Sequence, residues 1–307
     1  SPCNAMSYVT DLPNLTVAHF NGTNWDAHGN DGGFTGNASQ VKIYPKAKKE
    51  NAMSLGGIWK MFVETKKPIK RYILSPNDPA VLYNAMIAPI IPFAIKGALW
   101  YQGESNVGRA EQYEKLFPAM ITDWRNAWQQ DAFPFYFVQI APYQYGGQNI
   151  SAAALRDAQR KTLSLTNTGM AVIMDVGDTT TIHPSNKQAV GERLARLALA
   201  KNYGINIAFS GPMVKSAHAK GRQVQVAFTH AEGMQFKDSG TAIFEVAGAD
   251  KVFYQAKASI AGNEVIVSSD KVSAPAFVRY AYRSNAYGNL FNNAGLPASS
   301  FEISVNQ

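Results

Sequence analysis

Two short segments of the chain carry side chains suited to oxyanion and acid–base chemistry. The first, residues 101–106, reads Tyr-Gln-Gly-Glu-Ser-Asn. Its glycine, Gly103, lets the backbone approach a substrate closely, and the amides of Gln102 and Asn106 could donate hydrogen bonds to an oxyanion. An ordinary polar turn, with Asn106 in a left-handed conformation, would use the same residue types, and this alternative stays open.

The second segment, residues 175–183, ends on a histidine just before a candidate helix start at Ser185. The ordinary pKa of histidine lies near neutral pH, so His183 could act as a general base. Either Asp175 or Asp178 could orient its imidazole, as the acid of a catalytic triad does. The same residues could equally be a histidine that packs against the helix and two ordinary loop acids.

A repeated strand–helix pattern would position both segments. Strands are predicted over residues 95–101, 135–141 and 169–176, and helices over residues 111–128, 153–165 and 185–203. The last helix has a possible capping box at Ser185 and Gln188 and a stop signal at Gly204. Repeated β-α units predict an α/β fold with a parallel sheet flanked by helices. Ligands bind beyond the carboxyl ends of such strands, where both segments fall.

Antiparallel β-structure is predicted on both sides of this sheet. Residues 1–60 are rich in Gly and Asn and contain short alternating runs, so they are interpreted as part of a β-domain. Helical periodicity disappears after Ile205, where alternating runs such as residues 223–228 predict a small antiparallel β-domain. The predicted domains are therefore 1–60, 61–204 and 205–307.

Composition excludes several classes of function. The 307 residues are 46% hydrophobic and 17% charged, which is typical of a folded domain. No apolar run approaches the roughly 20 residues of a membrane span. The net charge of +7 comes from dispersed basic residues, without the stripe or module of a nucleic-acid binder. One cysteine and scattered histidines give no metal-ligand spacing, so we expect no metal or cofactor. From the dispersed charge and the short apolar runs, we expect no nucleic acid or membrane partner. Arg125 and Arg156 are expected on solvated helix faces.

Two blocks of sequence resemble the sialate O-acetylesterase family of the SGNH hydrolases. They are Gly-Ala-Leu-Trp-Tyr-Gln-Gly-Glu-Ser-Asn at residues 97–106 and Ile-His-Pro-Ser-Asn-Lys at residues 182–187, with supporting similarity at residues 81–89 and 116–121. The resemblance implies an SGNH-type parallel sheet and cofactor-free hydrolysis of acetyl esters on sialic acid or other acetylated glycans. It also implies a secreted or periplasmic protein.

The resemblance assigns roles by position. It implies His183 as general base, Asn106 as oxyanion donor with Gly103 lining the same hole, and Gln102, Glu104 and Trp100 as residues of the substrate pocket. Many SGNH hydrolases carry an Asp three residues before this histidine, where the present chain has Thr180. Asp178 is therefore the candidate acid that orients His183, and a Ser–His dyad is the alternative. Ser105 is not expected to be the nucleophile.

The chain departs from the family pattern at the nucleophile. The family's serine lies in a Gly-Gln-Ser-Asn motif, which these 307 residues do not contain. Residues before about 80 resemble instead the end of a β-domain that many family members insert into the catalytic domain. We therefore expect the chain to correspond to the C-terminal portion of such an esterase, with the nucleophile on an N-terminal half or a second chain. A non-catalytic carbohydrate-binding protein or an inactive scaffold is the alternative.

Overall fold

The computed structural model describes residue 75 and residues 78–146, 149–238 and 243–306, together with the backbone of three short strands before them. The chain divides into two compact units, Ser1–Leu74 and Ser75–Gln307. In the first unit, an antiparallel sheet is formed by β1 (Leu15–Ala18), β2 (Lys42–Pro45) and β3 (Met53–Ser54). The rest of the predicted β-domain of residues 1–60 lies outside the described residues.

The second unit contains the predicted parallel sheet. Its strands, in spatial order, are β4 (Ala98–Trp100), β5 (Phe135–Val138) and β6 (Thr168–Ala171). All three predicted strands are confirmed, each shorter than its apolar run. Every residue of β5 is buried, as expected of a central parallel strand with helices on both faces.

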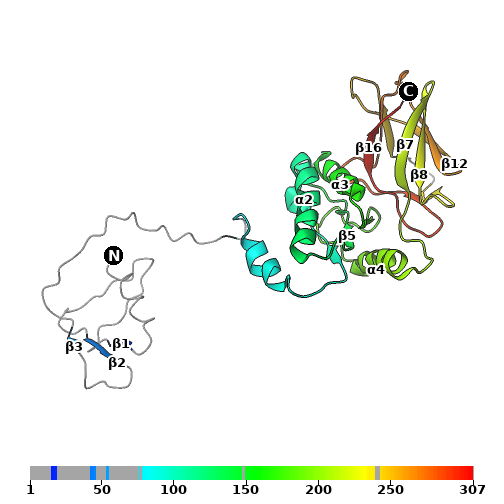
Figure 1. Cartoon of the computed structure of the whole chain (residues 1–307). Coiled ribbons are helices and arrows are strands. Elements are labelled where there is room, and N and C mark those ends of the chain that lie inside the picture. The colour runs from blue at the N-terminus through cyan, green and yellow to red at the C-terminus, as the bar shows by residue number, and fades with distance from the viewer. Residues whose placement is uncertain are drawn as a thin grey trace. The chain divides into compact units, whose positions relative to one another are not determined.

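Three long helices cover the two faces of this sheet. They are α2 (Ala110–Trp128), α3 (Ser151–Lys161) and α4 (Lys187–Tyr203). Helices α2 and α3 lie side by side, and Phe117 and Leu155 share a core with Phe137 of β5 (Figure 1). On the opposite face, Val190 and Leu197 of α4 pack on Tyr136 and Val138, among other residues. The predicted α/β class is therefore confirmed.

Shorter helical segments precede and connect these elements. They are a π-helical turn (Tyr83–Ile87) and 3₁₀ turns at Ala88–Ile90, Glu104–Asn106 and Thr162–Ser164. Within the described residues, no helix combines the length and the apolar character that crossing a membrane requires.

The ends of α4 show one correct and one wrong prediction. Gly204 ends the helix with φ 67°, a left-handed conformation that glycine adopts without steric cost. The N-cap, however, is Asn186 and not Ser185, because Asn186 Oδ1 accepts a hydrogen bond from the Ala189 backbone N–H at 3.1 Å. The helix therefore begins one residue later than the capping-box pattern indicated, at Lys187.

The C-terminal part of the second unit is antiparallel, as predicted. Its strands are β7 (Met213–Lys220), β8 (Gln223–Thr229), β9 (Gln235–Phe236), β10 (Phe244–Ala247), β11 (Tyr254–Gln255), β12 (Lys257–Ala261), β13 (Glu264–Ser268), β14 (Phe277–Tyr280), β15 (Leu290–Phe291) and β16 (Phe301–Ser304). Two four-stranded sheets have the orders β11-β10-β14-β16 and β12-β13-β8-β7. Phe228 of one sheet lies 5.9 Å from Phe301 of the other, between ring centroids, so the inner faces share a core.

The expectation that Arg156 lies on a solvated helix face is wrong. Its side chain is fully buried between α3 and the C-terminal sheets. The guanidinium donates to Ser300 Oγ at 3.1 Å and to the carbonyls of Ser284 and Arg283 at 3.3 and 2.6 Å. Arg125 is half-buried, and its guanidinium donates to the Phe133 carbonyl at 2.8 Å. Both arginines therefore satisfy backbone carbonyls.

Candidate functional site

Three loops follow the parallel strands at the carboxyl edge of the sheet, where ligands bind in open α/β folds. They span residues 101–106 after β4, 139–146 after β5 and 172–186 after β6. The Lys187 ammonium lies 5.1 Å from the ring centroid of Tyr101, which joins the first loop to the start of α4. The Gln144 N–H donates to the Thr179 carbonyl at 3.2 Å and joins the second loop to the third. The three loops therefore form one connected edge.

Hydrogen bonds fix the amides of Gln102 and Asn106 in the first loop. The Tyr113 hydroxyl donates to Gln102 Oε1 at 3.3 Å, so Gln102 Nε2 is free to donate to Asn106 Oδ1, at 2.7 Å. Among the described residues, neither Asn106 Nδ2 nor the backbone N–H of Gly103 has an acceptor. They are therefore unengaged donors of the kind that an oxyanion requires.

Gln159 of α3 holds the backbone of this loop in place. Its Nε2 donates to the carbonyls of Gln102 and Val138, both at 3.2 Å, and its Oε1 accepts from the Ile140 N–H at 2.9 Å. The sequence reasoning did not identify Gln159. The sequence signal that could have found it is the helical spacing of residues 152, 155 and 159, which places the polar Gln159 on the same face as Ala152 and Leu155.

Gly103 is packed closely against side chains of α3 and of the loop after β5. It is buried with φ 156°, a conformation that other residues rarely adopt. A Cβ atom at this position would lie 2.8 Å from Ile140 Cγ2 and 3.2 Å from Gln159 Nε2. The glycine is thus required by both the backbone conformation and the close approach of α3 and the loop after β5.

Replacing Gly103 with alanine is expected to lower the free energy of unfolding by about 2–4 kcal/mol, because it adds overpacking to an unfavourable φ. Urea unfolding of the 307-residue protein measures this loss. Gly108→Ala is the matched control, since Gly108 has φ 88° but no atom within 4 Å of an added Cβ. That variant carries the backbone cost alone, about 1 kcal/mol. Equal losses in the two variants would contradict the close packing at Gly103.

Tyrosine hydroxyls surround Glu104 in the first loop. Burial, and next the Glu104 charge, raises the pKa of Tyr101 to about 12, and both raise the pKa of Tyr145 further still. Burial also raises the pKa of Tyr113 to about 12. In the described part of the chain, the hydroxyls of Tyr101 and Tyr145 are buried without a hydrogen-bond partner. Such groups are uncommon in folded proteins, and here one lies in the first loop and one in the second.

His183 is exposed on the third loop. Its backbone N–H donates to Thr181 Oγ1 at 3.1 Å, and its imidazole forms no hydrogen bond or ion pair within the described ranges. The loop itself is anchored at Gly177, whose added Cβ would lie 2.6 Å from Pro142 Cδ. The Tyr287 hydroxyl, from the C-terminal sheets, donates to the Gly177 carbonyl at 3.0 Å. His183 is therefore exposed on a loop that the contacts at Gly177 keep in place.

The acids of the third loop are engaged by other partners. Asp175 forms a bidentate ion pair with Arg193 of α4, at 2.6 and 2.7 Å. Asp178 Oδ1 accepts from the Thr180 hydroxyl at 2.6 Å and the Thr180 N–H at 2.8 Å, and these bonds lower the pKa of Asp178. Over the residues that the structure describes, neither acid bonds to His183. Orientation of His183 by Asp178 stays a prediction without a contact to support it.

Trp100 lies on the α2 side of the sheet. Its ring centroid is 5.8 Å from that of Trp124 and 6.3 Å from that of Phe117. The Trp100 indole N–H is buried and, among the described residues, unpaired. The ring therefore packs in the core directly before the first loop, and its contact with substrate stays a prediction.

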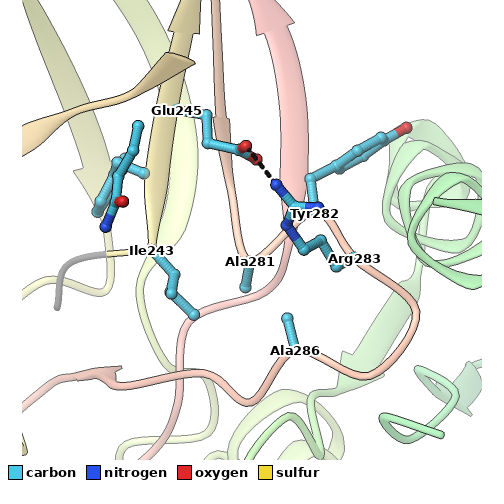
Figure 2. A pocket seen from close by; sticks show the side chains of 8 residues that line it. Ile243, Glu245, Ala281, Tyr282, Arg283 and Ala286 are labelled. Atoms are coloured by element: carbon cyan, nitrogen blue, oxygen red, sulfur yellow. Dashed lines mark hydrogen bonds and ion pairs between the residues drawn. The ribbon is translucent and has the colours of Figure 1, made fainter. Parts of the chain in front are cut away.

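A separate hollow of about 180 Å³ lies in the C-terminal sheets (Figure 2). Figure 2 shows Glu245 of β10 paired with Arg283, at 2.8 Å, and Glu245 also accepts from Arg279 at 2.8 Å. Both carboxylate oxygens are thus satisfied inside the protein.

Within the described residues, no group of three or more His, Cys, Asp and Glu side chains could hold a metal ion.

Comparison with known proteins shows which family the chain resembles. Residues 68–200 match the family model described as carbohydrate esterase, sialic acid-specific acetylesterase. Sialate O-acetylesterase of Rattus norvegicus is 33% identical over 210 residues, which cover 60% of this chain and 38% of the rat protein. The human sialate O-acetylesterase is 31% identical over 194 residues, covering 57% of this chain and 37% of the human protein.

The same similarity is found in a solved structure. The crystal structure of a carbohydrate acetylesterase from Xanthomonas citri superposes with a TM-score of 0.69 at 42% identity, covering 72% of this chain and 53% of that one. The present chain thus spans less than two fifths of the rat and human proteins and about half of the solved structure. Residues 68–200 of the chain are thus similar to the sialic acid-specific acetylesterase family of carbohydrate esterases.

Proposed function

We propose that these residues form the base-bearing and oxyanion-binding side of a carbohydrate O-acetylesterase. Its substrates would be acetyl esters on sialic acid or on other acetylated glycans. The observation that supports this most is the pair of unengaged donors, Gly103 N–H and Asn106 Nδ2, on a loop joined to the one that carries His183. The names of the related proteins give the acetyl ester as the reacting group.

In the proposed reaction, a serine oxygen attacks the acetyl carbonyl carbon and its proton passes to His183. The electron pair of the carbonyl moves to the carbonyl oxygen, which the N–H groups of Gly103 and Asn106 stabilise. Collapse of this intermediate expels the sugar oxygen, which takes the proton from His183. Water then attacks the acetyl-serine in the same manner, with His183 as the base, and acetate leaves.

We further propose that the serine comes from outside these 307 residues, on a strand beside β4. The Gly-Gln-Ser-Asn motif of the family is absent from the sequence. Strand β5 occupies one side of β4, and no described strand pairs with the other side. A parallel strand added there would end next to the Gly103 loop, since the carboxyl ends of parallel strands meet at one edge.

Exposed apolar side chains around β4 support the proposal of a further strand beside it. The side chain of Leu99, in the middle of β4, is 65% exposed, although parallel strands are normally covered on both faces. Apolar side chains of the segment before β4 are exposed as well, with Phe93 at 71% and Met86 at 64%. Isolated exposed apolar residues are common, but a run of them beside an open sheet edge is typical of an interaction surface.

The 307-residue protein alone is expected to hydrolyse p-nitrophenyl acetate at the background rate. Ser105→Ala should leave that rate unchanged, because Ser105 lies in an exposed 3₁₀ turn and is not the proposed nucleophile. The measurement is release of p-nitrophenolate by both variants against buffer. Robust turnover that disappears in Ser105→Ala would instead assign the nucleophile to Ser105.

A different outcome would favour the non-catalytic alternative. If adding the segment that carries a Gly-Gln-Ser-Asn motif, on the same polypeptide or as a second chain, restores no hydrolysis, the proposed enzyme function is wrong. Binding of acetylated oligosaccharides without turnover would then support a carbohydrate-binding protein.

A further inference from the structure

A second cavity, of about 440 Å³, lies at the end of the parallel sheet opposite the candidate active site. Its wall includes Thr168, the first residue of β6, whereas His183 follows the carboxyl end of that strand. Lys201 in the last turns of α4 and His230 after β8 line it from two further elements. The volume falls within the roughly 300–1,000 Å³ of small-molecule sites.

Basic side chains line this cavity. They are those of Arg160, Lys161, Lys201 and His230, and the described lining residues include no Asp or Glu. Burial lowers the pKa of His230, so His230 serves as a neutral donor and not as a cation. Arg160 and Lys161 have acidic partners outside the wall, because Arg160 pairs with Asp157 at 2.8 Å and Lys161 with Glu114 at 2.9 Å. Their charges are therefore partly neutralised by the protein itself.

Lys201 differs from these two residues. Its ammonium donates to the Thr168 carbonyl at 2.8 Å, and within the described ranges no carboxylate lies within ion-pair distance. Burial lowers the pKa of Lys201, which shows that the surroundings disfavour its charge. The ammonium also lies 5.8 Å from the ring centroid of Phe209. It has three N–H donors, and the bond to Thr168 uses one of them. A partly buried cation without a counterion is a position that an anionic ligand would stabilise.

His230 is held rigidly on the other side of the cavity. It has φ 53°, and its carbonyl accepts from Asn292 Nδ2 at 3.1 Å, so a buried side chain fixes this unusual backbone. Its ring packs on Phe209, at 4.9 Å between centroids. Non-glycine residues in left-handed conformations are uncommon, and they cluster at binding sites.

We propose that this cavity binds a small molecule that carries an oxyanion, with Lys201 as the anchoring cation and His230 as a second donor. The apolar side chains of Phe209 and Met213 would contact the rest of the ligand, which the volume limits to about the size of a sugar unit. The oxyanion could be the carboxylate of an acidic sugar or a phosphate group. This site does not depend on the proposed esterase reaction.

Isothermal titration calorimetry of the 307-residue protein tests the proposal with glucuronate, glucose 6-phosphate, inorganic phosphate and neutral glucose as probes. At least one of the anionic probes is expected to bind and glucose is not. A preference for glucuronate identifies a carboxylate site, a preference for glucose 6-phosphate a phosphate site, and binding of inorganic phosphate alone a site for the free anion. Absence of binding by all three anions, or equal binding of glucose, overturns the proposal.

Lys201→Gln is expected to weaken binding of the anion at least about tenfold, since a charge-assisted hydrogen bond is lost. Lys201→Arg should keep most of the affinity, because it keeps the cation. The matched control is Lys220→Gln, an exposed lysine at the end of β7 that does not line the cavity. Unchanged binding in Lys201→Gln, or equal weakening in Lys220→Gln, contradicts the assignment. Thermal unfolding of each variant confirms that it is folded.

Discussion

In the active enzyme, with the serine supplied, replacing His183 with alanine is expected to lower kcat for acetyl-ester hydrolysis by about 10³-fold or more. The serine hydroxyl is a weak nucleophile unless a base takes its proton, and His183 is the proposed base. The loop that carries His183 is anchored at Gly177 by close packing on Pro142 and by the Tyr287 hydroxyl. The imidazole makes no hydrogen bond among the described residues, so its removal should cost catalysis and little stability.

Steady-state kinetics with p-nitrophenyl acetate and an acetylated glycan, together with thermal unfolding, measure the two expectations separately. His218→Ala is the matched control, because His218 is an exposed histidine on β7, in the C-terminal sheets. Its activity and melting temperature should equal those of the parent protein. A loss of less than tenfold in His183→Ala would remove His183 from the mechanism. A large loss of stability would mean that the histidine has a structural role in the loop.

Much of the fold follows from local patterns in the sequence. The buried strand β5 was predictable because four successive apolar residues between turns fit a strand covered on both faces. The end of α4 was predictable because Gly204 adopts a left-handed conformation directly after the last helical turn. Its start was not, since Ser185 and Asn186 are both favourable caps and only the hydrogen bond to Ala189 decides between them.

The candidate site was predictable only in part. The residue types of Gln102, Asn106 and His183 indicate chemistry by themselves, whereas their support comes from residues distant in sequence. Gln159 donates to the carbonyl of Gln102, which lies 57 positions earlier in the chain. Only the packing of α3 against the sheet brings the two residues together. A periodic pattern gives the buried face of a helix but not the atoms that a polar side chain reaches on that face. The partner of Asp175, Arg193 on α4, was hidden for the same reason, whereas Asp178 accepts from Thr180, only two residues away.

The same limit applies to Arg156, and its burial leads to the second prediction. Its guanidinium donates to Ser300 and to the carbonyls of Arg283 and Ser284, which lie 127 to 144 positions away in sequence. The Ser284 carbonyl also accepts from the Tyr143 N–H in the loop after β5, so this arginine stands between the C-terminal sheets and one loop of the candidate site. Burial lowers its pKa to about 10, which still leaves the group charged at neutral pH.

Arg156→Met is expected to lower the free energy of unfolding by about 2–4 kcal/mol. Two effects oppose each other. Removing the charge relieves its desolvation, but buried acceptors left without a donor cost about 1–3 kcal/mol each. The Ser284 carbonyl keeps the bond from the Tyr143 N–H, but the Ser300 hydroxyl and the Arg283 carbonyl lose their donor, and this loss outweighs the relief. Urea unfolding measures the change, and Arg222→Met is the control. This exposed arginine donates to the Asp270 carbonyl at 3.0 Å and, within the described residues, to no other group, so the variant should lose less than about 0.5 kcal/mol. If Arg156→Met is as stable as that control, the buried arginine does not stabilise the packing of α3 against the C-terminal sheets.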